Sequence, residues 1–189
     1  SATGETNNIT VNAGTSKLQI GSTADVGAAV GVGTIAVTGQ LDLDGTISDA
    51  AALTVSLTSN IGNNVTTTGV QTYTGAATLS ANSTLTTTNS TIDFGGDVSG
   101  AFDLTASVGS GEVEFSSTVG ANAAVSDITI TGSLDLNGDI KNAAAAGAAT
   151  VSVSDKSTLN GDVFTSSTQS FEEIELESNT ELNADDANI

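Results

Sequence analysis

Six aspartates lie beside tight turns, where carboxylate chemistry could take place. They form three pairs, each next to a Gly or an Asn: Asp42 and Asp44, Asp93 and Asp97, and Asp135 and Asp139. Oxygen ligands grouped at a turn suit a hard divalent cation such as calcium. Neither an EF-hand loop nor a glycine-rich calcium nonapeptide occurs in the chain. We therefore treat the six aspartates as candidate calcium ligands, with solvated acids and turn formers as the alternative.

Paired carboxylates also carry out glycoside hydrolysis. The candidate pairs are Asp42 with Asp44 and Asp135 with Asp139, but both fall at repeated positions, where outward side chains or Asx turns explain them equally well. The chain contains no His, Cys or Arg, so catalytic triads, His or Cys metal sites and arginine clamps are excluded. We expect no enzymatic activity, and no cofactor other than calcium.

The charge of the chain is strongly negative. Twenty-two acidic residues stand against three lysines, which gives a net charge of −19. Binding to phosphate groups requires Lys and Arg, so we expect neither nucleic acid nor an anionic membrane surface as a partner. No apolar run is long enough to cross a bilayer, so we expect no membrane insertion.

A long internal repeat runs through the chain. Ile35 to Ile47 (IAVTGQLDLDGTI) matches Ile128 to Ile140 (ITITGSLDLNGDI), with every apolar position kept 93 residues later. Gln71 to Tyr73 likewise matches Gln169 to Phe171. The segment after Ile92 resembles the start of the chain, so the two ends read as two halves of one junction. We expect one continuous domain over 1–189, made of two long repeats (about 1–101 and 102–189) with no linker.

A shorter repeat lies inside the long one. Apolar residues alternate with polar ones and a Gly- or Asn-containing turn follows, a pattern typical of strands with one buried face. The expected inward anchors are Ile20, Leu43, Ile61, Leu79, Phe94, Phe115, Leu136, Leu159 and Leu176. This spacing predicts an all-β fold, a β-solenoid (parallel β-helix) of about nine coils of roughly 21 residues. The alternative is two tandem immunoglobulin-like β-sandwiches, although the absence of Trp and the short inner period disfavour it.

The segment TTTGVQTYTGAATLSANSTLTTTNSTIDFGGDV, from Thr66 to Val98, resembles the tandem repeats of large bacterial surface and secreted proteins. These are the filamentous-haemagglutinin-like adhesins, and the resemblance covers most of the chain. It implies a right-handed β-helix, a secreted or cell-surface location, and a non-catalytic structural or adhesive role.

Open solenoid ends expose unpaired strand edges and an apolar cross-section, which favour pairing with another copy. We therefore expect an extracellular structural protein, a self-associating building block of a rod or filament assembled head to tail. The expected self-association residues are Ile9, Thr10, Val11, Leu182 and Ile189. The alternative is an adhesin segment that binds a glycan or a host or cell-surface protein.

Four N-x-[ST] sequons occur, beginning at Asn8, Asn64, Asn82 and Asn89. In a chain this rich in Asn, Ser and Thr, sequons arise easily by chance, so they do not by themselves predict glycosylation.

Overall fold

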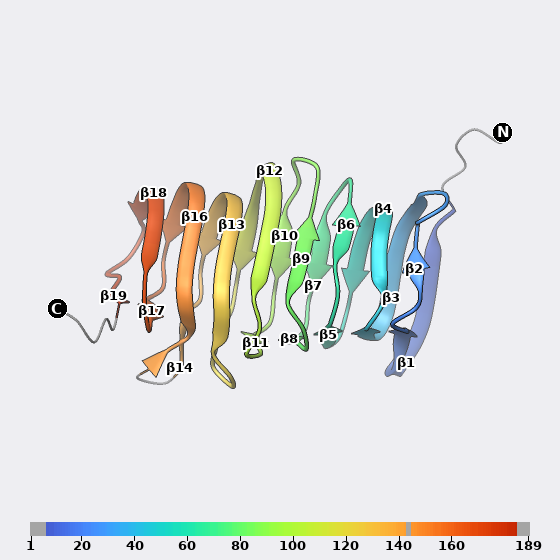
Figure 1. Cartoon of the computed structure of the whole chain (residues 1–189), viewed down its shortest axis with the longest axis horizontal. Coiled ribbons are helices and arrows are strands. Elements are labelled where there is room, and N and C mark those ends of the chain that lie inside the picture. The colour runs from blue at the N-terminus through green and yellow to red at the C-terminus, as the bar shows by residue number, and fades with distance from the viewer. Residues whose placement is uncertain (1–6, 143–144, 185–189) are drawn as a thin grey trace.

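The computed structural model describes residues 7–142 and 145–184, which form one β-solenoid (Figure 1). All ladders between its coils are parallel. The antiparallel pair among the described residues is a small hairpin of β14 (Lys141–Asn142) and β15 (Ala145–Ala146). The predicted all-β solenoid is therefore confirmed. The sandwich alternative is wrong, because the sheets of an immunoglobulin-like sandwich are antiparallel.

Each coil has three sides, which we name A, B and C in chain order. In the first coil they contain Ile9–Asn12, Lys17–Ile20 and Asp25–Val26. The short strands each lie on a single side. Side A holds β7 (Gln71–Tyr73) and β10 (Ile92–Phe94). Side B holds β5 (Ser59–Ile61), β8 (Ala77–Leu79), β11 (Val98–Ser99), β17 (Val163–Thr165) and β19 (Leu182–Ala184), and side C holds β2 (Asp25–Val26), β6 (Val65–Thr67) and β9 (Ser83–Thr86). The longer strands turn a corner: β1 (Ile9–Ile20) and β3 (Val32–Leu43) cover A and B, while β4 (Thr46–Val55), β12 (Leu104–Phe115), β13 (Val125–Leu136), β16 (Ala148–Leu159) and β18 (Gln169–Leu176) cover C and A.

Side A stacks its inward side chains in columns that run the length of the rod. One column contains Val11, Val37, Val55, Tyr73, Phe94, Phe115, Leu136, Leu159 and Leu176. These nine rows are separated by about 21 residues on average, which agrees with the expected coil. The side chains from Val37 to Leu159 are buried, so the column is a continuous part of the core.

The nine anchors expected from the sequence fall into two columns rather than one. Ile20, Leu43, Ile61 and Leu79 stack on side B. Phe94 and the later anchors stack on side A. The switch coincides with the short spacing between Leu79 and Phe94. Alternation identifies a side chain that points inward, but it does not identify the side of the coil from which it points.

The two copies of the long repeat do not stand on the same side of the rod. Ile35 lies in the second row of side A, whereas its counterpart Ile128 lies in the sixth row of side C. Leu41 lies on side B, whereas its counterpart Leu134 lies on side A. The copies are thus separated by four coils and two sides, which is not a whole number of turns.

A glycine corner recurs in both copies despite this rotation. Gly39 has φ 147° and Gly132 has φ 129°, a conformation that glycine adopts without the steric penalty other residues meet. The Gly39 N–H donates to Ser56 Oγ, and the Gly132 N–H donates to Ser154 Oγ, both at 3.0 Å. The repeat therefore encodes a corner that works at two different positions around the coil.

A glutamine corner recurs in the same way. Gln71 Nε2 donates to the Val65 carbonyl at 3.3 Å and to the Thr86 carbonyl at 2.9 Å. Gln169 Nε2 donates to the Val163 carbonyl and to a carbonyl in β19, both at 2.9 Å. Each glutamine thus joins two successive rows of the side that precedes it, side C for Gln71 and side B for Gln169.

Candidate functional site

Three acidic side chains form one outward column on side A. Asp93, Glu114 and Asp135 occupy successive rows in β10, β12 and β13, about 4.8 Å apart. Burial raises the pKa of Asp93 above its ordinary value, and the neighbouring Glu114 carboxylate raises it further. The structure thus brings together two of the six candidate aspartates. Glu114, between them, was not predicted, because its place in the column depends on which rows adjoin.

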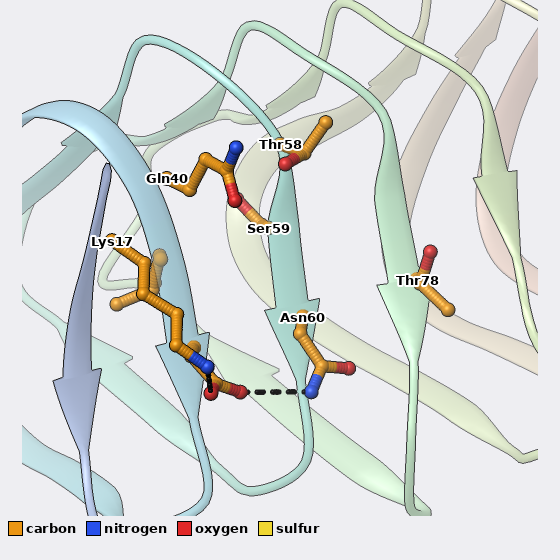
Figure 2. Close-up of a pocket in the computed structure, with 8 residues that line it drawn as sticks. Lys17, Gln40, Thr58, Ser59, Asn60 and Thr78 are labelled. Carbon is orange, nitrogen blue, oxygen red and sulfur yellow. Dashed lines mark hydrogen bonds and ion pairs between the residues drawn. The ribbon is translucent and has the colours of Figure 1, made fainter. Parts of the chain in front are cut away.

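Asp42 lies on side B at the edge of a shallow groove of about 380 Å³. Its carboxylate accepts hydrogen bonds from Lys17 Nζ and, at 2.9 Å, from Asn60 Nδ2 (Figure 2). These two partners, with Lys17 the stronger, lower the pKa of Asp42 below its ordinary value. The groove is otherwise lined by the polar side chains of neighbouring rows, among them Gln40 and Thr78. Asp42 therefore already has a cationic partner within the chain.

Asp97 and Asp139 lie at the corner that leads into side B. Asp97 Oδ1 accepts from the Thr118 N–H at 3.2 Å, and Asp139 Oδ1 accepts from the Asp162 N–H at 2.9 Å. Asp162 continues the series by accepting from the Glu181 N–H at 2.9 Å. The bond from the Glu181 N–H, and to a lesser extent the hydrogen bond from the Lys141 side chain, lowers the pKa of Asp162 below its ordinary value. These carboxylates cap the backbone of the next coil, as Asx side chains do at turns.

Asp44, the sixth candidate, lies in the turn after β3, where its carbonyl accepts from Asn63 Nδ2 at 3.0 Å. Within 7–142 and 145–184, no group of three acidic side chains converges in an arrangement that could hold a metal ion. The six aspartates instead occupy separate places: the side A column, the side B groove and the corners. Calcium binding stays a prediction.

The sequon asparagines have a structural role that the sequence did not reveal. Each side-chain oxygen accepts a backbone N–H from the coil that follows, at 2.9 to 3.0 Å. The pairs are Asn8 with Thr34, Asn64 with Thr84, Asn82 with Asp103, and Asn89 with Ser110. In three of the four sequons, the capping Asn comes two residues before an outward strand residue: Thr10, Thr66 and Thr84.

All three lysines form ion pairs between successive coils. Lys17 pairs with Asp42, and Lys156 pairs with Glu175. Lys141 lies between Asp139 at 2.8 Å and Asp162 at 3.2 Å. These pairs lie on sides A and B in the first two and the last three rows, so the few cations of this acidic chain are placed near the two ends of the rod.

The predicted self-association residues lie in the outermost described rows. Among the described strands, β1 pairs with β3, β18 with β16 and β19 with β17, so each end row has one edge without a described partner. Ile9 and Val11 are half-buried and Thr10 is exposed. Leu182 is 42% exposed, and Ile174, on side A of the same end coil, is 41% exposed. Ile189 lies outside the described residues.

No family model, curated protein or solved structure matches this chain. In the part of the chain that the structure describes, no helix is long and apolar enough to span a bilayer.

Proposed function

We propose that this chain is a non-catalytic structural protein, a β-solenoid building block that associates head to tail into a rod or filament outside the cell. In this arrangement β1 of one copy stacks on β18 and β19 of the next. The partner is therefore another copy of the same chain.

The exposed apolar side chains of the last described row carry the proposal. Leu176 is 55% exposed, although Leu159, directly beneath it in the same column, is fully buried. Leu182 is 42% exposed, whereas Val163 beneath it is fully buried. These side chains point along inward columns, and one more row would bury them. Burial of apolar area at about 25 cal/mol per Å² favours the addition of that row.

The charge of the chain supports end-to-end rather than side-by-side association. At a net charge of −19, the sides of two rods repel each other. An end row offers unpaired backbone groups as well as apolar side chains, and strand addition uses both. Because added salt screens repulsion between exposed charges, we expect salt to promote elongation.

The extracellular location rests on the resemblance of Thr66 to Val98 to filamentous-haemagglutinin-like repeats. The same resemblance supports the alternative, an adhesin segment that binds a glycan or a surface protein. A shallow polar groove on side B, lined by Gln40, Asn60 and Thr78, is the surface that this alternative would use (Figure 2).

Sedimentation velocity over a range of protein and salt concentrations tests the proposal. The wild-type chain should form species larger than a monomer, in greater amount at higher salt. Thr10→Pro should block this association. The Asn7 carbonyl faces β3, where it accepts from the Gly33 N–H, and backbone groups of successive strand residues point to opposite edges, so the Thr10 N–H faces the open edge. Proline removes that N–H, which the added copy would need for strand pairing. Thr10→Val, which keeps that N–H, is the matched control. A wild-type chain that stays monomeric throughout contradicts the proposal.

A further inference from the structure

We propose that the head-to-tail junction has one register, in which Lys17 of one copy pairs with Glu181 of the next. This inference rests on the proposed self-association and specifies its geometry. It follows from the columns of the solenoid, because each column that begins in β1 can be followed row by row to the last described row.

Three inward columns begin and end with matching apolar residues. The column that begins at Ile9 ends at Ile174, and the column that begins at Val11 ends at Leu176. On side B, the column that begins at Leu18 ends at Leu182. Its intermediate members are Leu41, Ser59, Ala77, Val98, Val119, Ile140 and Val163. A copy shifted along the axis by nine rows therefore continues all three columns at once.

The outward column beside the Leu18 column begins with a cation and ends with an anion. It starts at Lys17, passes through Gln40, Asp139 and Asp162, and ends at Glu181, the residue before Leu182. In the nine-row register, Lys17 of the added copy lies one row above Glu181, about 4.8 Å away along the axis. Lys17 and Glu181 are both exposed in the single chain, so both are available to a neighbour.

The same column already contains an arrangement of this kind. Lys141, which follows directly after the Ile140 position, bridges Asp139 and Asp162 of two successive rows at 2.8 and 3.2 Å. At the junction, Lys17 would bridge Asp42 in its own chain and Glu181 of the neighbour. In both places a lysine pairs with acids on different rows, although the acids at the join would lie two rows apart, with the row of Lys17 between them. The pair matters for register because it opposes rotation of the added copy by one side about the axis, which would place Lys17 on a different side of the rod from Glu181.

Charge reversal at the two positions tests the register. Lys17→Glu and Glu181→Lys should each self-associate more weakly than wild type, by roughly five-fold or more in the apparent dissociation constant, because each creates a like-charge junction. Glu181→Lys makes the net charge less negative, so general repulsion predicts the opposite result for it. Lys156→Glu, which removes an ion pair within the chain, is the control for the charge change in Lys17→Glu. Thermal unfolding of each variant confirms that it is folded.

A mixture of the two variants provides the decisive measurement. In an equimolar mixture, alternating Lys17→Glu and Glu181→Lys chains form only opposite-charge junctions, so association should return toward the wild-type level. The chain carrying both substitutions should recover as well. Electron microscopy of the filaments should give an axial repeat of about 43 Å, nine rows of about 4.8 Å.

The outcomes separate this inference from the proposed function. Recovery in the mixture together with the nine-row repeat supports the register. If the wild type assembles but the mixture stays as weak as its components, the register is wrong and self-association stands. If the wild type does not assemble, the proposed function fails and this inference fails with it.

Discussion

The rings of Tyr73 and Phe94 stack in successive rows of one column, with their centroids 5.2 Å apart and 13° between their planes. Phe115 continues the stack in the next row at 5.3 Å and 16°. All three side chains are at most 1% exposed. Half of the six aromatic residues of the chain are therefore gathered in the middle of the rod, where they fill the interior of three adjoining coils.

Truncation of the central ring should be costly. Phe94→Ala leaves a cavity between Tyr73 and Phe115 and should lower the free energy of unfolding by about 3–5 kcal/mol. Phe94→Leu should cost less, because it refills part of the volume. Phe102→Ala, at a position that is 38% exposed, is the matched control and should change stability little. Urea unfolding measures all three, and equal losses at Phe94 and Phe102 would contradict the column.

Replacement of the buried corner glutamine should destabilise more than replacement of its counterpart. Gln71→Leu removes the donor to the Val65 and Thr86 carbonyls and the acceptor of the Tyr73 hydroxyl. Each buried group left unpaired costs about 1–3 kcal/mol. Gln169 is only half-buried, so water can replace part of what Gln169→Leu removes. If urea unfolding shows the same loss of unfolding free energy for both variants, the two glutamines are equally shielded from water and the prediction is wrong.

The single tyrosine reports on the integrity of the core at high pH. Burial raises the pKa of Tyr73 far above its ordinary value of 10.0. Because the folded chain holds this proton more tightly than the unfolded chain, stability should fall as the pH rises above about 10. Phenolate absorbance should therefore appear together with the loss of β circular dichroism. Phenolate formation in the fully folded chain would show that Tyr73 is accessible to water.

Two aspartates should respond to pH with opposite signs. The pKa of Asp93 is raised, so its ionised form opposes folding, and Asp93→Asn should raise the melting temperature at neutral pH. That advantage should shrink as the pH falls through the Asp93 pKa. The pKa of Asp162 is lowered, so Asp162→Asn should lower the melting temperature at neutral pH. That deficit should disappear as the pH falls below 3.8, through the lowered Asp162 pKa. The same sign for both variants across the titration would contradict this assignment.

Calcium should be compared with sodium at equal ionic strength. The candidate aspartates are distributed along columns and corners rather than gathered around a point, so we expect salt to raise the melting temperature mainly by screening their repulsion. Calcium and sodium chloride should then act alike. An additional rise with calcium that a chelator reverses, and that Glu114→Gln removes, would instead establish a bound cation beside Asp93 and Asp135.

Local alternation of apolar residues was enough to predict the parallel coils and the inward positions of residues such as Leu43 and Phe115. It was not enough to assign residues to sides, because the coils differ in length and the alternation of inward and outward residues starts anew after each corner. The step from Leu79 to Phe94 shows this: both residues point inward, from different sides. Glu114 was missed for the same reason, since its neighbours in space depend on the row register.

The corners were difficult to predict for another reason. Gly39 and Gln71 have ordinary local sequences, and their roles follow from contacts with residues of other rows, such as Ser56 and Thr86. The 93-residue match was visible in the sequence, but only the ladder shows that it returns on a different side.

The change of side between the two copies of the long repeat determines where surface features would lie along an array of such repeats. Each repeat advances four coils and two sides, so a surface feature encoded once per repeat returns to its original side only after three repeats, or fourteen coils. Intermediate copies would display it on the other two sides. A long array of such repeats would thus present each feature on the three sides in turn, and a flat surface lying along one side of that array would meet every third copy.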